Sequence, residues 1–344
     1  MDLQKKTTIK DIGDLLGLTP SAVSKALNDH PRISAKTKAA VKEAAIKLHY
    51  QPNFLSSALR KGKSNMVGLI VPRINTNYYA SVIENIEDVL NKNGYNVIMA
   101  QTNESYLKEC KSIDNLLNIQ VDGIIASIAH ETVDFDYYRK IKEKGVPLIL
   151  FDRGENDLDV DYIGIDDYNC SQLIVEHLVK QKYTRIAHIT GFRHTRIFNN
   201  RIRGFKDALE KFGLPIQNEL IIESNLQIED GRRIMKSLLE LDIRPDAIYA
   251  ASDNVALGAL QVLLEEKIKV PDEIAIVGFG NEPFGTIIKP EISTINQFSA
   301  EIGKQAALAF LERINHPKRK VSLNKIILDA ELLIRNSSKK QPFD

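Results

Sequence analysis

Two polar residues four positions apart, Ser21 and Lys25, could hydrogen-bond to the edges of nucleic-acid bases. They follow Thr19-Pro20, a pair that typically begins a helix, because threonine caps it and proline at the first position loses no hydrogen bond. On such a helix both side chains share one face, while Val23 and Leu27 point inward. A slim helix with small polar outer residues fits a major groove about 12 Å wide. The spacing predicts a DNA-reading helix, although any small helical domain can show it.

Three short helices are expected in the first 50 residues. The first follows Thr8 and ends at Gly17, the second carries the polar pair, and the third opens at Ser34. The apolar residues of the first and third helices are Ile9, Ile12, Leu15, Leu16, Val41, Ala45 and Leu48. Two helices joined by a tight turn form a helix–turn–helix arrangement, in which Thr8, Ser24 and Asn28 could bond phosphates.

The charge distribution favours the same interpretation. The chain has 46 basic and 45 acidic side chains, a net charge of +1. Residues 1–62, however, hold eleven Lys and Arg against five Asp and Glu. The remaining residues have a small excess of acid. A basic head on a mildly acidic body indicates that only the head faces a polyanion.

A short amphipathic segment follows Pro52. Residues 53–60 carry Leu55 and Leu59 on one face, and a basic run at 60–63 comes next. A helix this short is not stable alone in water. It could fold against DNA and place a leucine between base steps of the minor groove, or it could be a plain interdomain linker. The residues leave both possibilities open.

From residue 66 onward, apolar runs alternate with amphipathic helical segments. The runs are typical of parallel strands covered on both faces and lie at 67–71, 97–101, 123–127, 148–151, 186–190, 247–251 and 274–278. Repeated βα units of this kind form doubly wound sheets. This segment of about 280 residues is longer than one such sheet usually requires, and its length is typical of two. The predicted fold is a small all-α helix–turn–helix head followed by an α/β body of two doubly wound lobes.

Patterns for enzymes, metals and membranes are missing from the sequence. Gly62-Lys63-Ser64 resembles the end of a Walker A motif, but the earlier glycine falls at Ser57 and no strand precedes it. His130-Glu131 lacks the second histidine of a zinc helix. We therefore expect neither an enzyme nor a cofactor or metal.

Cysteine use and hydropathy predict the compartment. Cys110 and Cys170 form no CxxC pair and are expected to be reduced packing thiols. The first six residues are polar, and no stretch approaches the ~18 apolar residues of a membrane span. The expectation is a cytoplasmic protein without a membrane partner.

The chain also resembles the lactose/galactose repressor (LacI/GalR) family of bacterial transcription regulators. The resemblance is most specific in the N-terminal segments 8–13, 18–28, 30–34, 48–53 and 59–60. Weaker matches follow in order at 67–72, 121–125, 151–153, 176–178, 252–259, 277–279 and 293–297. The match covers nearly the whole chain.

The resemblance implies a homodimer that represses transcription from a palindromic operator in double-stranded DNA. By position, Ser21 and Lys25 would read bases, and Leu59 would be the minor-groove wedge. Pro20, at a family reader position, offers no side-chain donor. The implied DNA-binding residues are Thr8, Thr19, Ser21, Ala22, Ser24, Lys25, Asn28, Asn53, Ser56, Leu59 and Arg60. The sequence shows no leucine-heptad tail, so we expect a dimer rather than a tetramer.

The resemblance also implies a periplasmic-binding-protein-like body with a small sugar-like effector between its lobes. The implied effector-binding residues are Tyr78, Tyr79, Ser127, Asp152, Arg201, Ser252, Asp253 and Gln297. Simpler roles remain open: Asp253 could cap a helix, Arg201 could pair with a surface acid, and the two tyrosines could be core residues.

Domain boundaries follow from the same comparison. The head is expected at 1–52, the hinge helix and linker at 53–64, and the effector-binding and dimerisation domain at 65–340. Its lobes would comprise 65–165 with 298–325, and 166–297 with 326–340.

One departure from the family concerns the cleft. The family often has an acid where this chain has Gly280, so a carboxylate that grips effector hydroxyls is missing. Without tryptophan, stacking on a sugar face would fall to a tyrosine or a phenylalanine, such as Phe198 or Phe284. A solute receptor that captures sugar without any DNA role is the alternative, and an enzyme on the same body is a more distant one.

Overall fold

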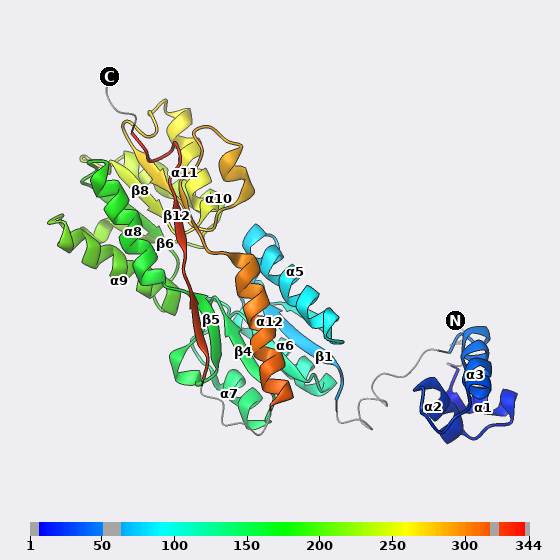
Figure 1. The fold of residues 1–344 in the computed structure, drawn as a ribbon. Coiled ribbons are helices and arrows are strands. Elements are labelled where there is room, and N and C mark those ends of the chain that lie inside the picture. The colour runs from blue at the N-terminus through cyan, green and yellow to red at the C-terminus, as the bar shows by residue number, and fades with distance from the viewer. Residues whose placement is uncertain (1–6, 51–62, 317–322, 341–344) are drawn as a thin grey trace. The chain divides into compact units, whose positions relative to one another are not determined.

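The structure is a computed structural model that describes residues 7–50, 63–316 and 323–340. The chain divides into two units, Met1–Ser64 and Asn65–Asp344, and each is described by itself (Figure 1). The predicted hinge helix, with Asn53, Ser56, Leu59 and Arg60, lies outside the described residues. Its helix therefore stays a prediction.

The first unit contains the three predicted helices. They are α1 (Ile9–Leu16), α2 (Pro20–Leu27) and α3 (Ala35–Lys47). Thr8, Thr19 and Ser34 cap them, and each side chain accepts a main-chain N–H of the first turn. These bonds satisfy donors that a helix leaves unpaired at its start.

A small core holds the three helices together. It consists of Ile12, Val23, Ala26, Val41 and Ala44. The sequence anticipated most of this pattern but placed Leu15 inside, whereas its side chain is 53% exposed. Eight-residue α1 presents only one stripe to its neighbours, and Leu15 lies off that stripe.

The first lobe of the body contains, in the described part of the chain, a six-stranded parallel sheet in the order β11-β5-β4-β3-β1-β2. Its strands are β1 (Met66–Val71), β2 (Asn96–Gln101), β3 (Gly123–Ala126), β4 (Leu148–Phe151), β5 (Asp161–Ile165) and β11 (Lys325–Leu328). Its helices are α5 (Asn77–Lys92), α6 (Tyr106–Ile119), α7 (Asp136–Glu143) and α12 (Ser299–Asn315), with η1 (Asn156–Leu158) before β5. Helices α5 and α12 cover one face, and α6 and α7 cover the other.

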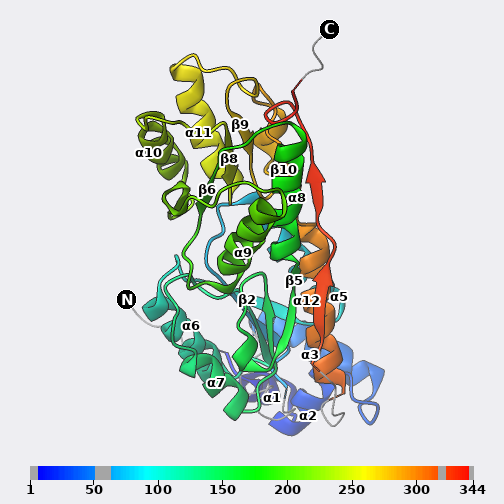
Figure 2. The same ribbon diagram turned by 90° about the vertical axis from the view of Figure 1, so that its left-hand side faces the viewer.

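The second lobe has a smaller parallel sheet in the order β7-β6-β8-β9. Its strands are β6 (Ile186–Thr190), β7 (Ile221–Glu223), β8 (Ala247–Ala250) and β9 (Ala275–Val277), and β10 (Thr294–Asn296) pairs antiparallel with β12 (Glu331–Leu333). Its helices are α8 (Asp167–Lys180), α9 (Arg196–Lys211), α10 (Ile228–Leu239) and α11 (Asp253–Glu265), with η2 (Asn218–Leu220) and η3 (Pro283–Thr286). Helices α8 and α9 lie on one face, and α10 and α11 on the other (Figure 2).

The chain crosses between the lobes three times within the described residues: after β5, after β10 and after β11. The predicted boundary at 325/326 is wrong, because it falls inside β11. This strand pairs with β5 from Lys325 to Leu328, so the last crossing follows Leu328. All seven predicted strands exist, but β5, β7, β10, β11 and β12 were not anticipated. They are short or interrupted by charge and glycine. Strand β2 lies at a sheet edge and is not covered on both faces.

Helices α5 and α12 approach so closely that a glycine is required between them. A Cβ on Gly303 of α12 would lie 2.4 Å from the main-chain oxygen of Val82 in α5. That distance is shorter than any ordinary contact, and the obstacle is backbone that cannot rotate away. The glycine therefore sets the spacing of the two helices that cover one face of the first sheet.

We expect Gly303→Ala to lower the free energy of unfolding by about 1–3 kcal/mol, because the added methyl overpacks this contact. The loss should appear in urea unfolding although alanine favours helices. Lys304→Ala, at the exposed neighbouring position, is the control and should change stability by less than about 0.5 kcal/mol. Equal effects of the two substitutions would contradict the close-packing argument.

Candidate nucleic-acid interface and ligand cleft

Helix α2 presents a polar face to solvent. Ser21, Lys25 and Asn28 are exposed, whereas Ala22 and Ser24 are half-buried. This arrangement follows from Val23 and Ala26, which are fully buried and fix the rotation of the helix. The two predicted base readers are therefore accessible together on one side of a short helix.

Three of the other predicted DNA-binding side chains make bonds within the unit. The Thr19 hydroxyl accepts the Ala22 N–H at 3.2 Å. The Thr8 hydroxyl donates to the Asp11 carboxylate at 2.7 Å, and Asn28 donates to the Ser24 carbonyl at 2.7 Å. These bonds orient α1 and α2 but also occupy groups that a phosphate contact would use.

The turn between α1 and α2 is held by close backbone contact. Gly17 has a φ of 63°, in the left-handed region that glycine adopts without strain. The Leu18 N–H donates to the Gly13 carbonyl at 2.9 Å, and a Cβ on Gly13 would lie 2.5 Å from the Leu18 oxygen. The turn is thereby fixed at the sharp angle that places α2 across α1.

In the body, a cleft lies between the two lobes. Its walls are loops that follow the carboxyl ends of strands in both sheets. Among the predicted effector-binding residues, those that line it are Tyr78, Tyr79, Asp152, Arg201, Ser252 and Gln297. Ser127 and Asp253 lie behind the wall and reach the cleft only through their neighbours.

Arg201 is fixed at the second-lobe wall by a buried acid. Its Nε donates to Asp167 Oδ1 at 2.8 Å, and its Nη1 donates to the Ala251 carbonyl at 3.1 Å. The guanidinium lies 3.5 Å from the centre of the Phe279 ring. Burial raises the pKa of Asp167 to about 6, although Arg201 opposes the shift. The partner is thus an internal acid and not the surface acid that the sequence left open.

Asp152 is oriented by hydroxyl groups at the first-lobe wall. It has a φ of 57° at the end of β4, and Tyr79 donates to its Oδ2 at 2.7 Å. The Ser127 hydroxyl lies 3.4 Å from the same oxygen, so Ser127 positions the acid from behind. These bonds hold the Asp152 carboxylate at the wall of the cleft.

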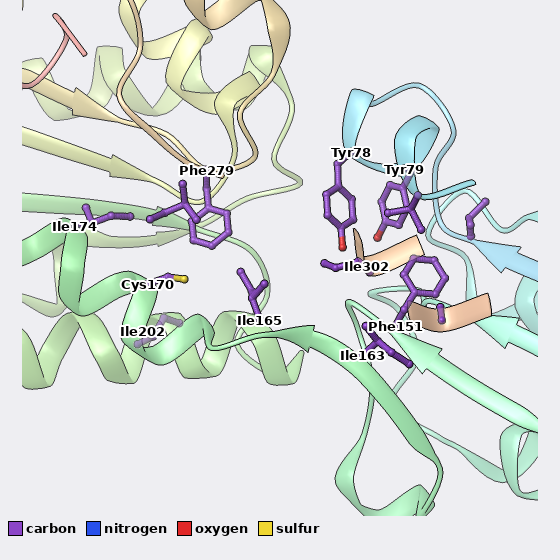
Figure 3. Close-up of a cluster of buried hydrophobic side chains, with 14 of the residues drawn as sticks. Tyr78, Tyr79, Phe151, Ile163, Ile165, Cys170, Ile174, Ile202, Phe279 and Ile302 are labelled. Atoms are coloured by element: carbon purple, nitrogen blue, oxygen red, sulfur yellow. The ribbon is translucent and has the colours of Figure 1, made fainter. Parts of the chain in front are cut away.

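The two tyrosines belong to both the core and the cleft. Tyr78 and Tyr79 are buried, and their rings meet edge to face at 5.1 Å. Figure 3 shows them beside Ile302, across from Phe279 of the second lobe. The Tyr78 hydroxyl is buried without a hydrogen-bond partner in the described part of the chain. A ligand hydroxyl or water would satisfy it.

The sequence interpretation missed a charged network at the first-lobe rim. Glu104 accepts from Arg153 at 2.6 Å, from Arg73 at 3.3 Å and from the His130 main chain at 3.0 Å. Its side chain is 5% exposed, and these donors hold its pKa well below the usual range although burial acts in the opposite direction. All four residues follow strand ends, which is the signal that could have found them.

The second-lobe wall combines aromatic rings with main-chain turns. Phe192 and Phe198 line the cleft, whereas Phe284 packs against the core of α10 and α11 and is not a stacking candidate. Gly280 also lines it, with a φ of 129°. A Cβ at this position would lie 3.9 Å from Gln297 Nε2 and 4.0 Å from Asp253 Oδ2, which are ordinary contact distances.

Ser252 and Asp253, which are neighbours at the start of α11, have different structural roles. The Ser252 hydroxyl caps α11 by accepting the Asn254 N–H at 3.2 Å. Asp253 accepts from the Glu282 N–H and the Thr294 hydroxyl, each at 2.7 Å. Burial raises the pKa of Asp253 to about 6, and these two bonds oppose the shift. Asp253 therefore fixes the loop after β9 and is not the helix cap.

Residues 7–50, 63–316 and 323–340 contain no cluster of three or more His, Cys, Asp or Glu that could hold a metal ion. Cys110 and Cys170 are buried free thiols. Across these residues, no helix is long and apolar enough to span a bilayer.

Comparison with known protein families accounts for both units. Residues 8–53 match the family described as bacterial regulatory proteins, lacI family. Residues 64–335 match periplasmic binding proteins and the sugar binding domain of the LacI family. The first match falls within the first unit, and the second match covers most of the second unit.

Individual relatives extend over the whole chain. The transcriptional regulator DegA of Bacillus subtilis (strain 168) is 32% identical over 97% of this chain and 98% of its own. The regulator NtdR of the NTD biosynthesis operon, from the same organism, is 30% identical over 96% of this chain and 99% of its own.

Solved structures show the same architecture. The complex of the transcriptional regulator CelR with cellobiose has a TM-score of 0.73 at 25% identity and covers 96% of this chain and 100% of its own. The lac repressor dimer bound to operator and the anti-inducer ONPF has a TM-score of 0.84 at 22% identity, over 97% of this chain and 99% of its own, which shows the fold. The expected head and two-lobed body are confirmed, and the chain belongs to the LacI family of bacterial DNA-binding transcriptional regulators, which are not enzymes.

Proposed function

We propose that this regulator is a repressor that binds a palindromic operator as a homodimer and responds to a small sugar or sugar derivative in the interlobe cleft. The observation that carries the proposal is that one chain joins an exposed polar helix face to a cleft with uncommitted hydrogen-bonding groups. A sensor and a DNA reader are both needed for ligand-controlled repression. The similar folds of CelR in complex with cellobiose and of the lac repressor bound to operator support this view by analogy.

The DNA half of the proposal rests on α2. Ser21 and Lys25 are exposed on one face, and the hydroxyl of one and the ammonium of the other can donate to base edges. A good base contact contributes about 1–3 kcal/mol of discrimination. The basic balance of the head would add affinity that is independent of sequence, through release of counterions.

The effector half rests on the balance of charge in the cleft. Two of its charged groups are paired with opposite charges: Glu104 with two arginines, and Arg201 with Asp167. The carboxylate of Asp152 accepts the Tyr79 hydroxyl, and that of Glu282 accepts the Asn77 N–H. What remains for a ligand is a set of polar groups between aromatic rings. This chemistry suits an uncharged molecule with several hydroxyls and one apolar face.

Two alternatives make different demands on the same groups. A solute receptor would use the cleft but would leave the polar face of α2 without a role. A nucleobase effector would use the ring stacking together with the side-chain amides of Asn225, Gln227 and Gln297, all of which line the cleft. A ligand screen of sugars, sugar phosphates and nucleobases separates these classes.

Effector binding would act through the arrangement of the lobes. A ligand changes the arrangement only by binding one form more tightly than another, and typical coupling is about 1–3 kcal/mol. In this proposal, closing or opening the cleft changes the spacing of the two hinges in the dimer and therefore the affinity for operator.

We expect Lys25→Ala to reduce discrimination between operator and random duplex by about 5- to 150-fold, because the base contact is lost. Competition gel shifts at fixed salt measure this ratio. A salt titration should show a steep loss of affinity for both duplexes, which a solute receptor would not show.

Lys36→Ala removes an exposed lysine from α3 and is the matched control. It should weaken both duplexes alike and leave their ratio unchanged. If Lys25→Ala also preserved the ratio, Lys25 would not be a base reader.

We expect Arg201→Ala combined with Asp167→Asn to abolish the response to effector while operator binding persists. The second substitution is needed because Asp167 alone would be a buried unpaired charge, which costs several kcal/mol. Thermal unfolding with the screened compounds measures binding, since a ligand at ~100 times its Kd stabilises by about 2.7 kcal/mol.

Arg203→Ala, on the same helix but exposed, is the control and should keep the full thermal shift. A double variant that still responds like the unsubstituted protein would remove Arg201 from the effector site.

A further inference from the structure

Several contacts bridge the lobes within the described residues, among them the Arg196 guanidinium of α9, which lies 4.2 Å from the centre of the Tyr162 ring in β5. Two others are hydrogen bonds from a side chain of one lobe to the main chain of the other. In the first, Glu282 of the second lobe accepts the N–H of Asn77, the first residue of α5 in the first lobe. Its two carboxylate oxygens lie 3.1 and 3.3 Å from that nitrogen. The start of a helix carries partial positive charge, so an acid from the opposite lobe is stabilised there.

The Glu282 carboxylate is held in position by its own loop. The Glu282 N–H donates to Asp253 Oδ2 at 2.7 Å, and the other oxygen of Asp253 accepts the Thr294 hydroxyl. Asp253 is 1% exposed. The acid is thus presented from a fixed base and moves with the second lobe as a unit.

In the second contact, His194 of the second lobe donates from Nε2 to the main-chain oxygen of His130 in the first lobe, at 2.5 Å. A carbonyl oxygen can only accept, so Nε2 must carry the proton. The His130 ring stacks on Phe192 of the second lobe at 4.8 Å between centroids, and Phe192 stacks on His194 at 5.8 Å.

The base of this second contact is also fixed. His130 is bound to Glu104 through its main-chain N–H and its Nδ1, each at 3.0 Å. Glu104 is in turn bound by Arg153. His194 itself is exposed and falls outside the described lining of the cleft.

The two contacts share one design. Each joins a polar side chain of the second lobe to a main-chain group of the first lobe, and each partner is anchored within its own lobe. Neither contact can persist if the lobes separate by a few ångströms, because a hydrogen bond weakens steeply beyond about 3.2 Å.

We propose that Glu282 and His194 form a two-point latch that holds the cleft closed and sets how readily it opens. They are positioning residues: the latch changes the fraction of molecules in the closed form, and the apparent affinity for a ligand of that form changes in proportion. The inference deepens the proposed function, because this equilibrium is the one on which an effector would act.

The test measures closure in the full chain without DNA or effector. Spin labels at Lys108→Cys on α6 and Lys236→Cys on α10 report the distance across the lobes. Both positions are exposed. In Figure 2, α6 and α10 lie on the side away from the C-terminal strands, which are drawn in red. Cys110 and Cys170 are replaced by alanine, and excess unlabelled protein suppresses pairs between protomers.

We expect His194→Ala and Glu282→Ala each to raise the ratio of open to closed molecules by about 5-fold, and the double variant by more. Glu282→Gln keeps an acceptor but loses the charge, so its distances should lie between those of Glu282→Ala and the unsubstituted protein. Loss of folding would instead abolish the cooperative thermal transition, which is recorded for each variant.

Glu265→Ala is the control, because that acid pairs with Arg232 inside the second lobe. It should leave the distance distribution unchanged. A folded double variant with the same distribution as the unsubstituted protein would overturn the latch and leave the proposed function intact. Variants that open as expected, in a protein that binds neither effector nor operator, would support the latch and overturn the proposed function.

Discussion

The carboxyl ends of two parallel sheets face each other across the cleft, and most other features of the body depend on this constraint. It arises because the chain crosses between the lobes three times in the described residues, so neither sheet can turn its loops elsewhere. The loops that follow β1 to β4 and β6 to β9 then contribute to one surface. Asp152 after β4 and Phe192 after β6 both line the cleft although they belong to different lobes.

Charge compensation makes this surface suitable for an uncharged ligand. Glu104 and Asp167 would each be costly to bury alone, and each has an arginine partner that lowers the cost. The partners also fix the orientation of the remaining donors and acceptors before a ligand arrives. A preorganised site loses less entropy on binding than one whose side chains must be ordered.

The head shows a different balance between structure and function. Its core consists of a few side chains. Two of its helix caps, Thr8 and Thr19, are also among the predicted DNA-binding residues. Thr19 and Thr8 serve the fold, while Ser21 and Lys25 serve no neighbour that the fold requires. An exposed pair without a structural role on a rigid helix is what a specific interface needs.

The sequence by itself determined the three helices of the head, the alternation of strands and helices, and the family. These features depend on local periodicity and on caps such as Thr8 and Ser34, which act within a few residues. It also supplied Arg201 and Asp152 as cleft residues, through the resemblance. The pairing of Arg201 with Asp167, the Glu104 network and the contact between Glu282 and Asn77 were decided only by tertiary structure. Their partners lie from 26 to 205 residues apart, and a pattern in sequence carries no distance between such groups. Short strands such as β5 and β11 form for the same reason: a neighbouring strand, and not their own composition, makes them strands.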